Sequence, residues 1–288
     1  MAEIRLEQVS YLYSPDTPFE KTALDGINLR FTPGRITGVI GHTGSGKSTL
    51  AQLLSGILRP TSGRVLLDGE DLFADRKKAA SSRFRVGLVF QYPEYQLFEE
   101  TVYRDIAFGP KNMGKTEEEI RKSVLDAAHF TGIGADLMEK SPFELSGGQK
   151  RRVAIAGVLA MDPEVIVLDE PAAGLDPSGR EEILGRLKTY QREKRKTVIL
   201  ISHSMEDVAR FADELLVLKN GKAFLHDTVD AVFEKAERLE EAGLALPQIT
   251  RLMLLLQSRG VPVSPRVHTV PDAVFELTRL LKGGDADA

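Results

Sequence analysis

The order of apolar and polar positions along the chain predicts strands and helices that alternate. Residues 4–9 and 28–31 alternate between apolar and polar side chains, which is typical of half-buried strands. Residues 35–40, 165–168 and 197–201 are nearly continuous apolar runs, the pattern of parallel strands that are covered on both faces. The run at 35–40 leads into a glycine-rich stretch and then into a helical pattern. A strand, a glycine loop and a helix in this order predict an α/β fold.

Two turns and a long helical stretch mark the region that follows. Asp68-Gly69 and Asn220-Gly221 each separate two short apolar runs, so both predict β-hairpins. Between residues 101 and 162 the pattern is mostly helical. Thr116 is followed by three glutamates there and predicts a capped helix start.

The last part of the chain, after about residue 230, has a different pattern. Apolar side chains recur at helical spacing in residues 249–256 and again in 274–281. Pro262 and Pro265 lie between the two stretches. We therefore expect a small helical extension that follows the α/β domain.

Composition and charge exclude several classes of protein. The 288 residues include 38 lysines and arginines against 42 acids, a net charge of −4, so no nucleic-acid partner is expected. The absence of cysteine excludes disulfides, thiolate metal sites and cysteine nucleophiles. No apolar run approaches the roughly 18–20 residues of a spanning helix, and the first residues lack a signal-peptide pattern. We expect a soluble, cytoplasmic chain that is able to dock onto a membrane partner.

The glycine-rich stretch fits the phosphate-loop pattern G-x-x-x-x-G-K-[ST] and reads Gly41-His42-Thr43-Gly44-Ser45-Gly46-Lys47-Ser48. The glycines let backbone N–H groups curl around a β-phosphate. Lys47 offers a charge to the β- and γ-phosphates, and the Ser48 hydroxyl is a Mg²⁺ ligand. The following helix adds its N-terminal dipole. A glycine-rich turn before a helix is the simpler alternative, but the strand before the motif favours a nucleotide site.

Two carboxylates follow the apolar strand at 165–168. Asp169 ends this strand beside the phosphate loop, where open α/β sheets bind ligands, and it suits the Mg²⁺ environment. Glu170 is placed to orient or deprotonate an attacking water. Acids that simply cap a strand are the alternative, which the upstream phosphate loop disfavours.

A second glycine pair lies in the pentapeptide Leu145-Ser146-Gly147-Gly148-Gln149. Ser146 is a good N-cap for a helix expected at 150–161, and the glycines would leave bare N–H groups facing outward. This gives a second phosphate-binding surface in a chain with one phosphate loop. The two surfaces fit chains that pair head to tail, each completing the other's nucleotide site.

These motifs resemble the ATP-binding-cassette (ABC) family, whose signature reads LSGGQ, over residues 3–230. The resemblance implies a P-loop NTPase of ABC type at 1–230, with a three-layer α/β core, an antiparallel β subdomain and a helical subdomain at about 95–160. The remainder, 231–288, is a C-terminal helical extension and a candidate for dimerisation. The implied cofactors are ATP and Mg²⁺.

The resemblance also assigns roles to single residues. Tyr13 resembles the aromatic that stacks on adenine, although Tyr11 is also available, and Gln91 resembles the glutamine that reaches Mg²⁺ and senses the γ-phosphate. The implied catalytic residues are Glu170 and His203, where His203 resembles the switch histidine. The implied metal contacts are Ser48, Gln91 and Asp169. The implied nucleotide contacts are Tyr13, Gly41, His42, Thr43, Gly44, Ser45, Gly46, Lys47, Ser48, Thr49 and Gln91, and in trans Ser146, Gly147, Gly148, Gln149 and Asp176.

A narrower resemblance lies in residues 90–98, 101–110 and 150–157, which are similar to the ATPases of energy-coupling factor (ECF) transporters. Gln96-Leu97-Phe98 and Gly109-Pro110 resemble the second of the two ATPase subunits. This implies an importer of vitamins, cobalt or nickel at the cytoplasmic face of the cell membrane, with the chain bound peripherally. The implied partners are a homologous or identical ATPase subunit, an integral membrane coupling subunit and a substrate-binding membrane subunit. One departure is Ala172, where the family often has threonine.

Three alternatives compete with this interpretation. A soluble ABC ATPase that acts on DNA or ribosomes usually has two cassettes or a long coiled coil, and this chain has neither. The ATPase of another ABC importer is disfavoured by residues 91–110. A cassette that binds ATP without turnover is disfavoured by Glu170 and His203.

A docking site for the membrane partner is predicted at residues 92–98. Its aromatic and apolar side chains are predicted to form a groove for an amphipathic helix, with an acidic rim of Glu94, Glu99 and Glu100. The alternative is that the aromatic residues pack inside the helical subdomain.

Overall fold

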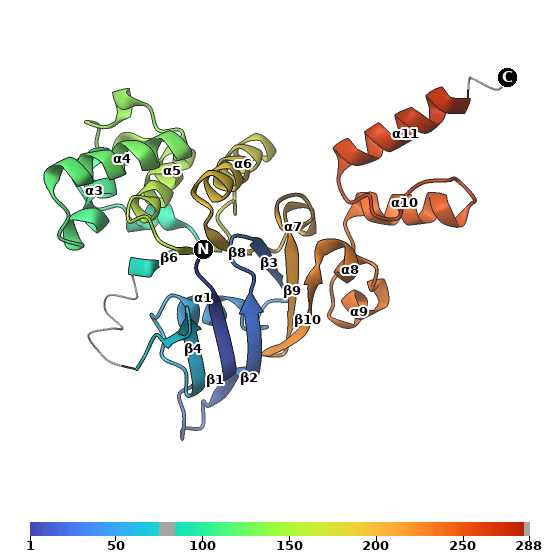
Figure 1. Ribbon diagram of the computed structural model, residues 1–288, viewed down its shortest axis with the longest axis horizontal. Helices are drawn as coiled ribbons and strands as arrows, with labels where there is room; N and C mark the ends of the chain where they lie inside the picture. The colour runs from blue at the N-terminus through green and yellow to red at the C-terminus, as the bar shows by residue number, and fades with distance from the viewer. Residues whose placement is uncertain (75–83, 285–288) are drawn as a thin grey trace.

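The computed structural model describes residues 1–74 and 84–284, which form two sheets (Figure 1). The first sheet is antiparallel, with the strand order β2-β1-β4-β5. Its strands are β1 (Ile4–Tyr13), β2 (Lys21–Phe31), β4 (Ser62–Leu67) and β5 (Glu70–Asp71). The β4–β5 turn confirms the hairpin predicted at Asp68-Gly69.

The second sheet has the order β10-β9-β3-β8-β7-β6 and is parallel from β9 to β6. Every residue of β3, β7 and β8 is buried, which confirms that these apolar runs are strands covered on both faces. The antiparallel β9–β10 pair confirms the hairpin at Asn220-Gly221. The strands are β3 (Ile36–Ile40), β6 (Val86–Val89), β7 (Val165–Asp169), β8 (Thr197–Ile201), β9 (Glu214–Lys219) and β10 (Lys222–Thr228).

The first helix, α1 (Lys47–Leu54), lies between the two sheets. Leu50, Leu53 and Leu54 are fully buried in one apolar cluster that also contains Phe31 of the antiparallel sheet and Val167 of the parallel sheet. The helix begins directly at the phosphate loop and ends four residues earlier than the pattern suggests, because the chain turns at Gly56 with a φ of 73°.

Helices cover the other face of the parallel sheet. They are α3 (Val102–Asn112), α4 (Glu117–Thr131), α5 (Gly147–Leu159), α6 (Pro177–Lys194) and α7 (Met205–Phe211). Thr116 caps α4 in a reciprocal capping box with Glu119, as predicted. Helices α3, α4 and α5 contact one another and form the helical subdomain (Figure 1). The layers therefore match the predicted three-layer α/β fold with a β subdomain and a helical subdomain.

The C-terminal part consists of the helices α8 (Val229–Phe233), α9 (Ala236–Glu241), α10 (Gln248–Ser258) and α11 (Val270–Gly284). Helices α8 and α9 pack against the sheet at β9 and β10, and α10 and α11 extend away from the sheets (Figure 1). The last two confirm the predicted helices. They enclose a small apolar cluster of their own around Met253, Val263 and Val267. Residues 285–288 of the predicted extension lie outside the described residues, and in the described part no helix is long and apolar enough to cross a membrane.

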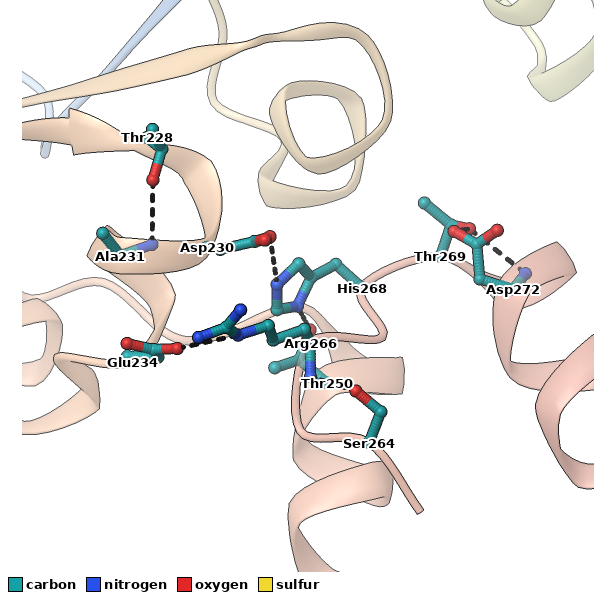
Figure 2. A network of polar contacts seen from close by, with 10 residues as sticks. All are labelled: Thr228, Asp230, Ala231, Glu234, Thr250, Ser264, Arg266, His268, Thr269 and Asp272. Carbon is teal, nitrogen blue, oxygen red and sulfur yellow. Dashed lines mark hydrogen bonds and ion pairs between the residues drawn. The ribbon is translucent and has the colours of Figure 1, made fainter.

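A buried histidine anchors this extension, and Figure 2 shows its contacts. The Nε2 atom of His268 lies 3.1 Å from Oδ1 of Asp230 on α8, and its Nδ1 atom lies 3.0 Å from Oγ1 of Thr250 on α10. Its ring meets Phe233 edge to face, with 4.9 Å between centroids. Nearby, the exposed Arg266 forms an ion pair with Glu234. Burial lowers the pKa of His268, and Asp230 partly opposes this shift.

Candidate nucleotide-binding and hydrolysis site

The parallel strands bring four predicted segments to one edge of the sheet. The register of β3, β8 and β7 places Val39, Ile201 and Asp169 side by side. The phosphate loop, Glu170, His203 and Gln91 each follow one of these strands or the neighbouring β6, so all four segments emerge at this edge. Between them lies a cavity of about 370 Å³ lined by Tyr13, Lys21, Ala23, Thr43, Gly44, Gly46, Lys47, Ser48, Thr49, Gln91, Asp169, Glu170 and His203.

The backbone of the phosphate loop adopts a conformation that requires glycine at two positions. Gly44 and Gly46 have φ values of 81° and 104°, in the left-handed region that side chains disfavour. A Cβ at Gly46 would lie 2.6 Å from the carbonyl oxygen of Ala23, so the loop also packs too closely for any other residue. The loop therefore presents backbone rather than side chains to the cavity, as a phosphate site requires.

Three of the predicted loop contacts do not line the cavity. The side chain of Ser45 is fully buried, and Gly41 lies beneath it, against the backbone of β9. The ring of His42 is turned aside, with Nδ1 2.8 Å from the carbonyl oxygen of Thr43 and Nε2 3.2 Å from Oδ1 of Asn220. These three residues shape the loop from behind, and the cavity-facing members begin at Thr43.

Lys47 supplies the buried positive charge of the cavity. Its Nζ atom donates hydrogen bonds to the carbonyl oxygens of Gly41 at 2.7 Å and His42 at 3.1 Å, which fold the side chain over the loop. Burial lowers the pKa of Lys47, and the nearby carboxylates of Glu170 and Asp169 oppose that shift. The ammonium group is therefore held at the loop and faces the acids across the cavity.

Asp169 and Ser48 form the oxygen-rich side of the site. Asp169 is buried at the end of β7, and burial raises its pKa, while a hydrogen bond from Ser48 and the charge of Lys47 lower it. In the described part of the chain, no group of three His, Cys, Asp or Glu side chains is arranged to hold a metal ion. A hydroxyl and one carboxylate nevertheless fit Mg²⁺, which takes few protein oxygens and completes its shell with water and substrate phosphates.

Glu170 and His203 face each other at the far side of the cavity. The Nε2 atom of His203 lies 3.4 Å from Oε1 of Glu170, a buried oxygen that has no hydrogen-bond partner among the described residues. Glu170 sits at a φ of 53°, a left-handed turn that aims its side chain off the strand end. Burial and the neighbouring charge of Asp169 raise its pKa to about 7. Burial, followed by the charge of Lys47, lowers the pKa of His203.

The structure favours Tyr13 over Tyr11 as the aromatic of the cavity. Tyr13 is half-exposed there and its hydroxyl lies 3.1 Å from Oγ1 of Thr49, whereas Tyr11 packs against the apolar cluster. The cavity also includes Lys21 and Ala23, which sequence reasoning missed. Strand pairing places Lys21 directly opposite Tyr13. The number of residues in the turn after Tyr13 was therefore the signal that could have placed Lys21 at the cavity.

The signature segment lies at the start of α5 and does not line the cavity of its own chain. Ser146 caps the helix reciprocally with Gln149, which confirms the predicted cap. The helix begins at Gly147 rather than at Lys150. A Cβ at Gly147 or Gly148 would meet no atom within 4 Å, so both glycines border open space. Asp176 caps α6 by accepting from the N–H of Gly179 at 2.7 Å.

The aromatic side chains of the segment after Gln91 are exposed, whereas Leu97 of the same segment packs against the core. Tyr95 and Phe98 are 85% and 57% exposed, and a cavity of about 330 Å³ opens between this segment and helices α3 and α5. The prediction that Glu94 belongs to an acidic rim is wrong. Its carboxylate forms two hydrogen bonds with the buried Arg151, at 2.6 and 3.0 Å, so it is committed to an internal ion pair.

Comparison with known proteins places this site in a family. The family model described as ABC transporter matches residues 24–173. The energy-coupling factor transporter ATP-binding protein EcfA2 of Caldanaerobacter subterraneus subsp. tengcongensis is 51% identical over 280 residues, covering 97% of this chain and 98% of that protein. The chain belongs to the ABC transporter family. EcfA2 of Clostridium tetani is also 51% identical to this cassette and covers 96% of each chain.

Solved structures agree with this assignment. The cassette cbiO1 of Clostridium perfringens, described as part of the ABC transporter complex cbiONQ, aligns with a TM-score of 0.74 and 43% identity over 87% of this chain and 98% of its own. The dimeric bacterial cassette MJ0796 aligns with a TM-score of 0.70 and 30% identity, over 78% and 98% of the two chains. The predicted fold and the predicted resemblance to ECF ATPases are both confirmed.

Proposed function

We propose that this cassette binds and hydrolyses ATP as a subunit of an ECF-type importer for a vitamin or a transition-metal ion such as cobalt or nickel. The observation that carries the proposal is the single cavity in which Tyr13, Lys47, Asp169, Glu170 and His203 converge. The aromatic ring of Tyr13 suits the adenine, and the ammonium group of Lys47 suits the phosphates. The carboxylate of Asp169 suits Mg²⁺, and Glu170 is a base for the attacking water. The names of the curated relatives support the importer.

The residues divide the chemistry of hydrolysis between them. Ser48, Asp169 and Gln91 would hold Mg²⁺, which would neutralise phosphate charge when bound. Lys47 contacts the β- and γ-phosphates. Glu170 accepts a proton from the water as the water oxygen bonds to the γ-phosphorus and the bond to the β–γ bridging oxygen breaks, which yields ADP and phosphate.

The state of Glu170 suits this task. A pKa of about 7 places the carboxylate near the operating pH of a general base. His203, at 3.4 Å, limits where that carboxylate can turn and contacts the γ-phosphate. The raised pKa of Glu170 and the short distance from Glu170 to His203 therefore both suit Glu170 to act as the base.

The site is completed by a second ATPase subunit, identical or homologous, that binds head to tail. Ser146, Gly147 and the N–H groups at the start of α5 contact the γ-phosphate held by the opposite chain, because an uncovered helix N-terminus favours an anion. Asp176 belongs to the segment that crosses this interface. The dimeric form of a structurally similar cassette supports the arrangement.

The membrane partners meet the segment 92–98 from the cytoplasmic face. Tyr95 and Phe98 offer apolar surface beside the cavity of about 330 Å³, which suits one amphipathic helix of an integral coupling subunit. Arg151 ties this segment to α5 through Glu94 and to the loop after Glu170 through the carbonyl of Ala173. Closure of the dimer is thereby transmitted to the docked helix, and a separate membrane subunit selects the solute.

Assembly and transport test this assignment directly. The double variant Tyr95→Ala with Phe98→Ala removes the exposed apolar surface without touching the nucleotide cavity. We expect the purified variant to bind ATP normally, to fail to copurify with the membrane subunits and to support no uptake. Phe19→Ala, which removes an 83% exposed ring from the turn between β1 and β2, is the matched control and is expected to assemble. Normal assembly of the double variant would refute the docking site.

A further inference from the structure

Beside the nucleotide cavity lies a second cavity of about 340 Å³ that the hydrolysis chemistry does not use. The two cavities share Glu170 and His203. The second is closed on its far side by Arg180 of α6 and by Ser202, Ser204 and Asp207 of the segment after β8. Its polar side chains therefore lie directly behind the two groups that are proposed to act on ATP.

Asp207 holds the loop of His203 from both sides. The Oδ2 atom of Asp207 accepts a hydrogen bond from Oγ of Ser202 at 3.4 Å, and the backbone N–H of Asp207 donates to Oγ of Ser204 at 3.1 Å. The N–H of Ser204 in turn donates to Oγ of Ser202 at 3.1 Å. The two neighbours of His203 are thus bonded to each other and to Asp207, Ser202 through the carboxylate and Ser204 through the backbone N–H, which fixes the backbone that carries the imidazole.

The same carboxylate faces helix α6. The Nη1 atom of Arg180 lies 3.7 Å from Oδ2 of Asp207, whose side chain is only 12% exposed. Within residues 1–74 and 84–284, Arg180 forms no other ion pair, and its side chain is 38% exposed. Arg180 sits one turn into α6, where its N–H donates to the carbonyl oxygen of Asp176 at 2.9 Å. A shift of Asp176 therefore moves Arg180 with the first turn of the helix.

We propose that Asp207 and Arg180 are positioning residues that couple the segment at Asp176 to His203. When the opposite subunit contacts Asp176, the first turn of α6 is fixed, and the Arg180–Asp207 pair sets the loop of His203 in the position that hydrolysis needs. Turnover then depends on the presence of the partner, while ATP binding to one chain does not. This inference rests on the proposed function, because it needs His203 to act on the nucleotide.

A second ion pair between the same helices supplies the control. Arg210 of α7 and Glu181 of α6 lie 2.6 Å apart, and both side chains are about half exposed. This pair joins α6 to α7 as the first one does, but among the described residues neither of its members hydrogen-bonds to Ser202 or Ser204. A purely structural role for α6–α7 ion pairs predicts similar effects from breaking either pair.

The test is steady-state hydrolysis by the full-length chain in its ATP-dependent dimer. Asp207→Asn and Arg180→Gln are each expected to lower kcat about tenfold to a hundredfold, the scale of a misplaced reacting group, with little change in KM or in ATP affinity. The double variant should lose no more than the worse single variant, since both changes break one link. Arg180→Lys should restore most of the kcat. Arg210→Gln with Glu181→Gln should leave kcat near the parent value.

Other outcomes overturn the proposal. An unchanged kcat in Arg180→Gln would overturn the proposal even if Asp207→Asn fails to fold, because Arg180 is the more exposed member of the pair. Equal losses in the Arg210 and Glu181 control would assign the effect to helix packing. Glu170→Gln separates this inference from the proposed function. If that variant loses turnover while Arg180→Gln keeps it, only the coupling is wrong, and if Glu170→Gln keeps turnover, the proposed catalytic site itself fails.

Discussion

The guanidinium group of Arg151 is buried against the carboxylate of Glu94, with Nη2–Oε1 and Nε–Oε2 distances of 2.6 and 3.0 Å. Arg151 is 3% exposed and follows the signature segment, whereas Glu94 is 16% exposed and follows Gln91. The pair therefore joins two segments that contact nucleotide in the proposed dimer. A geometry with two parallel N–H···O bonds also fixes their relative orientation.

Breaking this pair should destabilise the fold strongly. Glu94→Gln leaves a buried arginine with one weakened partner, and removing one member of a buried pair typically costs about 3–5 kcal/mol. We expect a clear loss in the free energy of unfolding measured by denaturant titration. The matched control is Glu100→Gln, which breaks the exposed pair with Arg104 and should cost less than about 1 kcal/mol. Equal stability of the two variants would contradict a structural role for the Glu94 pair.

Lys47→Ala tests the phosphate loop. The variant removes the ammonium group that faces the β- and γ-phosphates, and a hydrogen bond to a charged group is worth about 1.5–3 kcal/mol, so affinity for ATP should fall at least about tenfold. Hydrolysis should vanish. Isothermal titration with MgATP measures the affinity, and Lys222→Ala, which breaks an exposed pair with Asp25, is the control. Parent-like binding by Lys47→Ala would show that the loop has been misassigned.

Gly147→Asp tests the head-to-tail arrangement. A side chain at Gly147 meets no atom within 4 Å, so the chain should fold and a single copy should still bind ATP. The added carboxylate would face the γ-phosphate of the opposite chain, and the ATP-dependent dimer should be lost in light scattering. Gly185→Asp adds the same charge at another open glycine, in α6, and should dimerise normally. A stable ATP dimer of Gly147→Asp would argue against the composite site.

The buried His268 makes the stability of the C-terminal extension sensitive to acid. Its pKa is lowered by burial, although Asp230, Asp272 and Glu234 oppose the shift. As the pH falls, His268 takes up a proton in the unfolded chain near the ordinary histidine pKa of about 6.5, and in the folded chain only at a lower pH. The free energy of unfolding therefore falls as the pH drops below about 6.5.

Replacing this histidine should reduce the dependence on pH. His268→Gln is expected to be less stable at neutral pH but to lose less stability between about pH 7 and pH 5 than the parent, since one group no longer titrates. Denaturant midpoints across this range provide the measurement, with exposed His129→Gln as the control. An unchanged slope in His268→Gln would mean that other groups carry the acid sensitivity.

Local patterns were sufficient to predict the strands and most of the residues that line the candidate cavity. Some features depend only on residues that are close in the sequence, so the local sequence determines them. They include the strands at 165–169 and 197–201 and the helix caps at Thr116 and Ser146. The start of α5 was placed three residues late because two glycines are poor helix formers, yet the capping box holds them in the first turn.

Features that depend on distant residues were not predictable in the same way. Glu94 was assigned to a surface rim because its partner, Arg151, lies 57 positions further along the chain. Lys21 was missed because its place in the cavity follows from the register of β1 and β2 rather than from a motif. The Arg180–Asp207 pair joins two helices whose packing no local pattern specifies. Each of these contacts is fixed only when the sheet and the helices assemble.

Glu170→Gln tests most directly whether this cassette hydrolyses ATP in a composite site with Glu170 as the base. The substitution keeps the size and hydrogen bonding of the side chain but removes the base, and a general base contributes about 10²- to 10⁴-fold to the rate. Phosphate release and particle mass are measured on the same sample with MgATP. We predict that hydrolysis falls by that factor while an ATP-bound dimer accumulates. Parent-like turnover, or loss of ATP binding together with turnover, would contradict it.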